Sequence, residues 1–110
     1  MQVGIGMEPS RELLEDADVV AYVIVPESAA FTGRLNLYVD GKRLGRVPCL
    51  AICRPHDGPG LLLLHCDASW EILGVQAWNA PGVTNILTID EMMNVAERYY
   101  AGIAEHWALV

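Results

Sequence analysis

The chain has 110 residues, 53% of them hydrophobic, and 14 acidic residues against 7 basic ones give a net charge of −7. This length fits one domain, 1–110, with a core of its own, and the apolar fraction argues against intrinsic disorder. The acidic balance disfavours nucleic acid and anionic membranes, and the longest uncharged run, Ile72 to Ile89, contains polar residues and Pro81, which a bilayer core would not accept.

The first predicted elements are a short N-terminal helix and a strand. Ser10 can accept hydrogen bonds from free helix amides, and Glu12 suits the positive end of a helix dipole, in a segment with room for only about two turns. The seven uncharged residues Val19–Val25 are rich in β-branched side chains, which predicts a strand with both faces covered. Pro26 ends that strand or marks a sheet edge.

A long hairpin is expected next. Alternation over Arg34–Val39 predicts a strand, and Asp40-Gly41 supplies the residues of a tight turn, because glycine reaches positive φ without a steric penalty. Lys42–Cys53 is expected to return as the partner strand. Pro48 cannot donate a ladder hydrogen bond, so it should form a bulge or face an open edge.

Two more strands follow a loop rich in glycine and proline. Leu61–Cys66 is predicted to form a short buried strand. Trp70–Trp78 is predicted to form the next one, and Gly74 favours a bulge within it.

The strongest helix signal begins at Thr88. The residues Thr88 to Glu91 match a capping box, and Asp90 and Glu91 also oppose the helix dipole. The helix is expected to end at Gly102, or else to continue through Trp107. Its apolar residues form a broad stripe at helical spacing: Ile89, Met92, Met93, Ala96, Tyr99, Tyr100 and Ile103.

Together these elements predict an α+β fold. We expect an antiparallel meander sheet of four to five strands, with one main C-terminal helix packed on one face and a short N-terminal helix. One long helix covers only part of such a sheet. The second face must be closed by the N-terminal segment, by another subunit or by a partner, and for this reason we expect a homodimer or another form of association.

The three cysteines, Cys49, Cys53 and Cys66, are interpreted as reduced thiols that fill the core of a cytoplasmic protein, because Met1 to Met7 has no secretory signal. We expect no metal, since Cys49 and Cys53 on one strand lie roughly 13 Å apart, too far for one ion. If Cys53 pairs with Leu62, Cys49 comes opposite Cys66. A disulfide there is geometrically allowed, but the inferred compartment argues against it.

No catalytic residue and no cofactor are predicted. His65, Asp67 and Ser69 contain the residue types of a hydrolase triad, but residues in line along a strand lie about 6 to 7 Å apart. That spacing does not bring a nucleophile beside its base. The glycines form no phosphate-binding motif, and the P-loop pattern is absent.

Binding residues are predicted from charge and aromatic content. The stretch from Arg34 to Arg54 holds five basic residues and one acid, Asp40. It forms either a solvated hairpin face or a cationic patch that meets an acidic surface on this molecule or on a partner. Core and helix–sheet packing is the first interpretation of the tryptophans, but tryptophan is also a usual anchor of protein interfaces. The candidate binding residues are Arg34, Lys42, Arg43, Arg46, Trp70 and Trp78.

The function expected from these observations is non-enzymatic. Small size, acidity, uneven charge and the lack of a catalytic motif favour a cytoplasmic protein-interaction domain whose partner is another protein or a second copy. Its sharpest version is an immunity- or inhibitor-type protein that masks a basic effector. The alternative is a small-molecule-binding or enzymatic domain with a cavity between sheet and helix, where His65 or Tyr100 would be the polar group.

Overall fold

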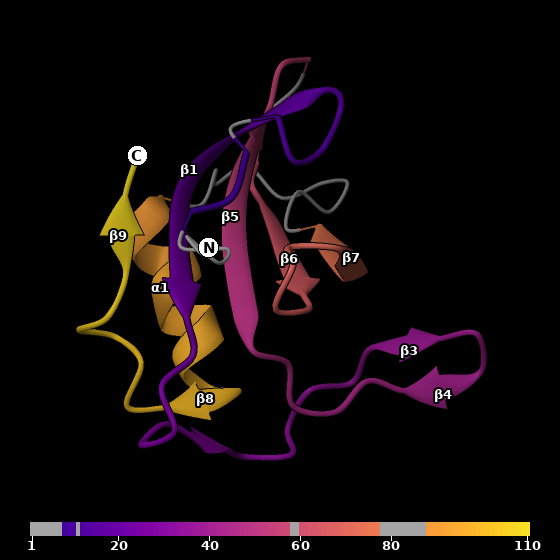
Figure 1. Ribbon diagram of the computed structural model, residues 1–110, viewed down its shortest axis with the longest axis vertical. Coiled ribbons are helices and arrows are strands. Elements are labelled where there is room, and N and C mark those ends of the chain that lie inside the picture. Colours follow the sequence, from indigo (N-terminus) through magenta and orange to yellow (C-terminus); the bar gives the residue numbers. More distant parts are fainter. Residues whose placement is uncertain (1–7, 11, 58–59, 78–87) are drawn as a thin grey trace, which may run out of the picture.

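The computed structural model describes residues 8–10, 12–57, 60–77 and 88–110. Within these residues the fold is mixed, with one antiparallel sheet of five strands in the order β7-β6-β5-β1-β9 and one helix, α1, Ile89–Glu97 (Figure 1). The strands of this sheet are β1 Ala17–Ile24, β5 Cys49–Pro55, β6 Leu62–Cys66, β7 Ile72–Ala77 and β9 Ala108–Leu109. Two small two-stranded sheets join β2 Ala30–Phe31 to β8 Tyr100–Ala101 and β3 Tyr38–Val39 to β4 Lys42–Arg43.

The prediction of a short N-terminal helix is wrong. The Ser10 side chain accepts a hydrogen bond from the amide of Glu12, and the Ser10 carbonyl accepts one from Leu13. Leu14 then forms an isolated bridge with Ala17, the first residue of β1. The segment therefore turns twice and enters the sheet before a helix can propagate, because helix nucleation is costly and too few residues are available to offset it.

A β-bulge lets β1 contribute side chains to both buried faces of the sheet. Val19 pairs with Cys53 and Ala21 pairs with Ile52, so Val20 is the extra residue. An extra residue reverses the alternation of side chains, and Val19 and Ala21 consequently belong to two different core clusters.

The larger core lies between the sheet and α1. It contains inward side chains of β1, β5 and β6 together with Met92, Val95 and Ala96 of the helix. The residues from the strands are Ala21, Val23, Leu50, Ile52 and Leu63.

The second face of the sheet is covered by the chain itself. Trp70 packs there with small residues of the strands, and Leu13 and Leu14 of the N-terminal segment pack against the same cluster. The sequence allows three ways to cover this face: the N-terminal segment, another subunit or a partner. In the described residues the N-terminal segment covers it, together with Trp70. An uncovered sheet face therefore gives no reason for association.

The long hairpin predicted over Arg34–Cys53 is wrong in extent. Its turn is as expected, since Asp40 (φ 53°) and Gly41 (φ 81°) both have the positive φ of a type I′ turn, but each arm has only two paired residues. The paired arm β4 ends at Arg43, and before β5 begins the carbonyl of Pro48 accepts a hydrogen bond from the amide of Val25. The following strand, β5, pairs with β1 instead.

The hairpin approaches the edge strand β7 closely at Gly74. His65 pairs with Gly74 and Cys66 pairs with Ile72, so a bulge adjoins Gly74 as expected. A Cβ atom at Gly74 would lie 2.7 Å from Leu37 Cδ2, which is closer than carbon atoms pack. The glycine thus lets the arm before β3 approach the sheet.

The capping box predicted at Thr88 is present. The Thr88 hydroxyl accepts from the amide of Glu91 (3.1 Å), and the Glu91 carboxylate accepts from the amide of Thr88 (2.9 Å). The predicted helix end is wrong, because α1 stops at Glu97 rather than at Gly102 or Trp107. The Glu97 carboxylate accepts from the amides of Gly102 (2.6 Å) and Ala104 (3.0 Å), which turns the chain back so that β8 can pair with β2.

Replacing Thr88 by alanine is expected to lower the free energy of unfolding by about 0.5 to 2 kcal/mol, because the Glu91 amide loses its acceptor. Urea denaturation of the two proteins measures the difference. Thr88→Ser keeps a hydroxyl that can accept the same hydrogen bond, so it serves as the control. An unchanged midpoint for Thr88→Ala would show that this cap does not hold the helix.

Candidate functional site

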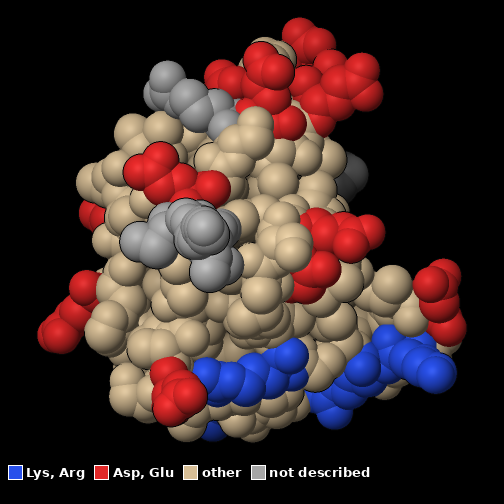
Figure 2. Space-filling view, in the orientation of Figure 1, with Lys and Arg blue, Asp and Glu red and all other residues tan. Residues whose placement is uncertain are grey.

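Four of the predicted binding residues gather around the β3–β4 hairpin, which extends sideways from the sheet (Figure 1). Blue side chains lie along this edge of the molecule in Figure 2. All four are exposed, and Tyr38 on β3 is 64% exposed beside them. We call this group the hairpin end: Arg34, Tyr38, Lys42, Arg43 and Arg46.

Two of these cations hold the local backbone in place. The Arg43 guanidinium donates to the carbonyls of Leu35 (2.8 Å) and Gly33. The Arg46 guanidinium donates to the carbonyls of Ala29 (2.6 Å) and Pro26 (2.9 Å). Carbonyl oxygens are neutral, so both side chains are fixed in place while their positive charges stay uncompensated by these contacts. The hairpin end is therefore a partly preorganised cationic surface.

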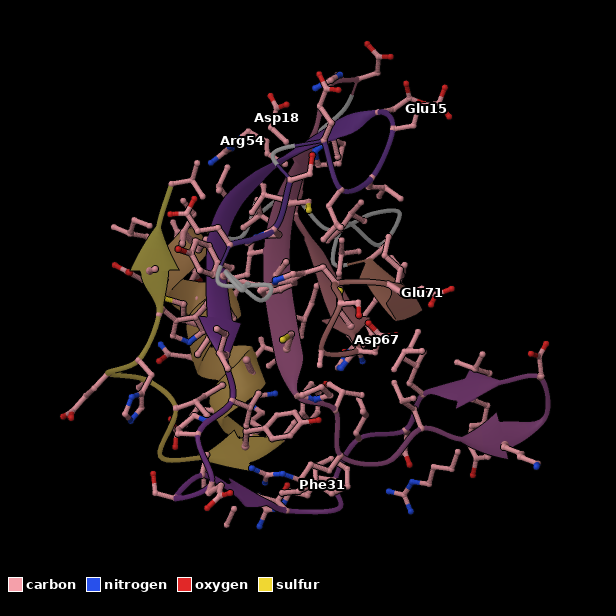
Figure 3. All side chains as sticks on the ribbon, viewed as in Figure 1. Glu15, Asp18, Phe31, Arg54, Asp67 and Glu71 are labelled. Carbon is pink, nitrogen blue, oxygen red and sulfur yellow. The ribbon has the colours of Figure 1, made fainter. Side chains whose placement is uncertain are left out.

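The remaining predicted residues are not part of this group. Arg54, the last cation of the basic stretch, lies near Asp18 at the opposite end of the molecule (Figure 3). Trp70 is 5% exposed and stands in a left-handed conformation (φ 65°) before β7, which begins at Ile72. Its ring meets Tyr22 edge to face with centroids 5.8 Å apart, as in core packing. Trp78 lies outside the described residues.

A partly buried hydrogen-bond network links β6, the edge strand β7 and the residue before β8. Gln76 donates from Nε2 to the Tyr99 hydroxyl (3.3 Å), and its Oε1 lies 2.9 Å from His65 Nε2. This arrangement places the His65 proton on Nε2, and within the described residues Nδ1 has no partner. Burial lowers the pKa of His65 from its usual 6.5, opposed in part by the hydrogen bond to Gln76.

The second candidate polar group, Tyr100, also serves the core. Its hydroxyl accepts a hydrogen bond from the amide of Val47 (2.9 Å), and burial raises its pKa. The Arg46 guanidinium lies 5.9 Å from the centre of its ring, within cation–π range. His65 and Tyr100 are both 0% exposed, so neither side chain reaches the surface in this conformation.

The cysteines have the pairing that the strand register predicted. Cys53 pairs with Leu62, and Cys49 therefore stands opposite Cys66. All three thiols are free and buried. Burial raises the pKa of Cys49 and Cys53 to about 11 and that of Cys66 to about 12, which keeps them protonated at neutral pH. Within the described part of the chain no three side chains of histidine, cysteine, aspartate or glutamate form a metal site.

Acidic side chains crowd the end of the molecule opposite the hairpin (Figures 2 and 3). His56 contacts two of these acidic residues. Its Nε2 lies 3.1 Å from Asp18 Oδ1, and its amide donates a hydrogen bond to the carbonyl of Asp16. The pKa of His56 is raised, first by the hydrogen bond to Asp18 and then by the charges of Asp18, Asp16 and Asp57. We call these exposed carboxylates the acidic end: Glu12, Glu15, Asp16, Asp18 and Asp57.

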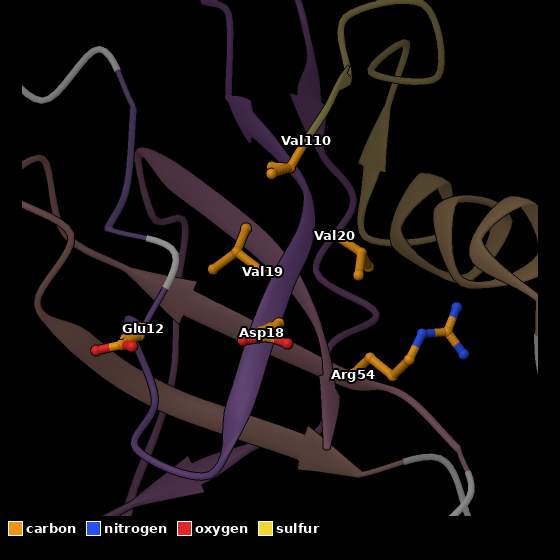
Figure 4. A pocket seen from close by; sticks show the side chains of 6 residues that line it. All are labelled: Glu12, Asp18, Val19, Val20, Arg54 and Val110. Atoms are coloured by element: carbon orange, nitrogen blue, oxygen red, sulfur yellow. The ribbon is translucent and has the colours of Figure 1, made fainter. Parts of the chain in front are cut away.

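A hollow of about 520 Å³ opens at the acidic end over the edge of β1 (Figure 4). It forms because β9 pairs with β1 only at Ala21 and Tyr22, and the last bond along this edge runs from the amide of Val110 to the carbonyl of Val20 (3.1 Å). The hollow is lined by Glu12, Asp18, Val19, Val20, Arg54 and Val110.

Sequence reasoning missed this hollow, although the run of acids from Glu12 to Asp18 was visible. Asp18 and Arg54 are paired across β1 and β5, and Val110 arrives from the far end of the chain. No local pattern indicates that these three residues meet. Tyr38 was also missed, although the alternation that places Leu35, Leu37 and Val39 on one face puts Tyr38 on the other, exposed one.

No family model, curated protein or solved structure matches this chain. No helix of the described residues is long and apolar enough to cross a membrane.

Proposed function

We propose that this chain is a non-enzymatic protein-interaction domain that binds an acidic protein surface through its hairpin end. The observation that carries the proposal is Tyr38, a large aromatic side chain that is 64% exposed on a projecting hairpin among four cations. Tyrosine and arginine are the residue types that most often dominate binding energy at protein interfaces.

The geometry supports a preformed contact surface. Arg43 and Arg46 are held by backbone carbonyls, so less side-chain entropy is lost when they meet a partner. Lys42 and Arg34 are exposed and add to the positive charge of the hairpin end. Charges of this kind set orientation and association rate, while Tyr38 supplies desolvated contact area. The binding takes place in the cytoplasm, where the three free cysteines stay reduced.

Replacing Tyr38 by alanine is expected to weaken binding of the partner by about 2 kcal/mol, or roughly 30-fold. The partner is isolated by chemical cross-linking and affinity capture from the cells that make the protein, and its dissociation constant is then measured with purified components. Glu71→Gln, at an exposed residue outside both the hairpin end and the acidic end, is the control and should bind normally (Figure 3). Equal binding by wild type and Tyr38→Ala would contradict the proposal.

A second candidate function is favoured by the acidic end. Five exposed carboxylates and a hollow at one place suit a basic effector, which an immunity- or inhibitor-type protein would mask. The same experiment separates the two candidates. If Glu12→Gln/Glu15→Gln loses the partner and Tyr38→Ala keeps it, the acidic end is the binding surface and the partner is basic.

A further inference from the structure

The hollow at the acidic end carries charges of both signs. Glu12 and Asp18 contribute carboxylates, and Arg54 contributes a guanidinium. Asp18 pairs with His56 at 3.1 Å, and the Arg54 side chain extends away from Asp18 although the two residues are opposite each other on β1 and β5 (Figure 4). The hollow therefore offers separate negative and positive points to an occupant, and Val20 and Val110 add an apolar part to its lining.

The tip of the β3–β4 hairpin carries the same two signs in a compact form. Asp40 and Lys42 flank Gly41, and all three residues are exposed. The turn has two residues and projects away from the body of the molecule, so it presents a narrow, charged end (Figure 1). Each surface therefore carries a positive and a negative group, and the two surfaces are complementary when groups of opposite sign meet.

We propose that the hairpin tip of one copy enters the hollow of a second copy, with Lys42 against Glu12 and Asp18, and Asp40 against Arg54. This inference rests on the proposed function, in which the hairpin end binds an acidic protein surface. Here that surface belongs to a second copy of the chain. Tip and hollow lie at different ends of the molecule, so the contact is head-to-tail and repeats until a ring closes or a chain grows.

Head-to-tail contact makes a specific prediction for mixtures of two variants. Lys42→Glu reverses a charge on the tip and leaves the hollow unchanged. Glu12→Lys reverses a charge in the hollow and leaves the tip unchanged. Each change places like charges together and should weaken self-association roughly a hundredfold. Sedimentation of either variant alone should therefore show monomers. An equimolar mixture should associate again, because the unchanged tip of Glu12→Lys fits the unchanged hollow of Lys42→Glu, and the two exchanged charges attract each other at the next contact.

Two further proteins sharpen this test. The double variant Lys42→Glu/Glu12→Lys restores opposite charges and should self-associate again, without joining wild-type protein. Glu27→Lys makes the same charge change as Glu12→Lys at an exposed residue outside the hollow, and it should assemble like wild type.

Three outcomes would overturn the inference. They are a wild-type protein that stays monomeric at millimolar concentration, a mixture of variants that stays monomeric, or variants that each form dimers alone through another face. Binding of a different protein that is lost in Tyr38→Ala while wild type stays monomeric would leave the proposed function standing and remove only the second copy as partner.

Discussion

Replacing Trp70 by alanine is expected to lower the free energy of unfolding by about 3 to 5 kcal/mol, the range typical of a buried tryptophan. The side chain is 5% exposed and packs with the cysteines and alanines of the second sheet face. Most residues of this cluster are fixed on β-strands, so they cannot move far enough to fill the space that the indole ring leaves. Urea denaturation monitored by far-ultraviolet circular dichroism measures the loss.

The turn that holds Trp70 provides the matched variants. Asp67 Oδ1 accepts from the amides of Ser69 (2.8 Å) and Glu71 (2.9 Å), so Asp67→Ala should destabilise the same face by a smaller amount. Leu109 is a large apolar residue that is 70% exposed, and Leu109→Ala should change stability by less than about 0.5 kcal/mol. A Trp70→Ala protein within 1 kcal/mol of wild type would mean that Trp70 is not part of the core and would return it to the candidate binding residues.

The parts of the fold that depend on local chemistry were predictable from the sequence. The capping box at Thr88 and the two-residue turn at Asp40-Gly41 involve residues close together in the chain, and both are present. The position of Cys49 opposite Cys66 was predictable only on the condition that Cys53 pairs with Leu62, and β5 and β6 have that register.

The parts that depend on distant pairing were not predictable. The residues after Pro48 have the composition of a returning hairpin strand, but β1 offers them a longer partner than the β3 arm does. Similarly, apolar spacing continues from Glu97 to Ile103, while pairing of β8 with β2 and the hydrogen bonds to the Glu97 carboxylate end the helix first. In both places tertiary contacts outweighed local propensity.

The candidate site divides in the same way. The cations of the hairpin end were found because they are close in sequence, although the carbonyl contacts that fix Arg43 and Arg46 could not be inferred. The hollow needs β1, β5 and the residue after β9 to meet, and only the three-dimensional arrangement shows it. The charge separation between the two ends is likewise a product of folding, because Arg54 belongs to the basic stretch in sequence and to the acidic end in space.

Acidification from pH 7 to pH 5 is expected to destabilise the protein through His65. The imidazole is 0% exposed, and Nδ1, the atom that would take the second proton, has no acceptor among the described residues. Burial lowers the pKa of His65 in the folded state, whereas in the unfolded chain it is near 6.5. The unfolded state therefore binds a proton first as the pH falls. The stability that the neutral ring contributes is present above pH 6.5 and is lost below it, by up to about 1.4 kcal/mol per pH unit until the folded pKa is passed.

His56 works in the opposite direction and must be separated from this effect. Its folded pKa is raised by Asp18, so its contribution is fully present below the unfolded value and is lost as the pH rises through the folded one. Removing it with His56→Ala should therefore leave the acid destabilisation in place and make it steeper. Proton chemical shifts of the two imidazoles, followed by NMR, give each folded pKa directly.

Urea denaturation at half-unit steps of pH then tests the role of His65 against a double variant, His65→Leu/Gln76→Leu. Replacing both partners of such a hydrogen bond with apolar groups of similar size costs little stability at pH 7. In this variant the Tyr99 hydroxyl is the one polar group of the network that remains, and Tyr99 is 8% exposed. The difference in unfolding free energy between wild type and this variant should shift in favour of the variant as the pH falls from 7 to 5. Parallel pH profiles would show that protonation of His65 is not what destabilises the fold, and that its Nδ1 finds a partner when the proton arrives.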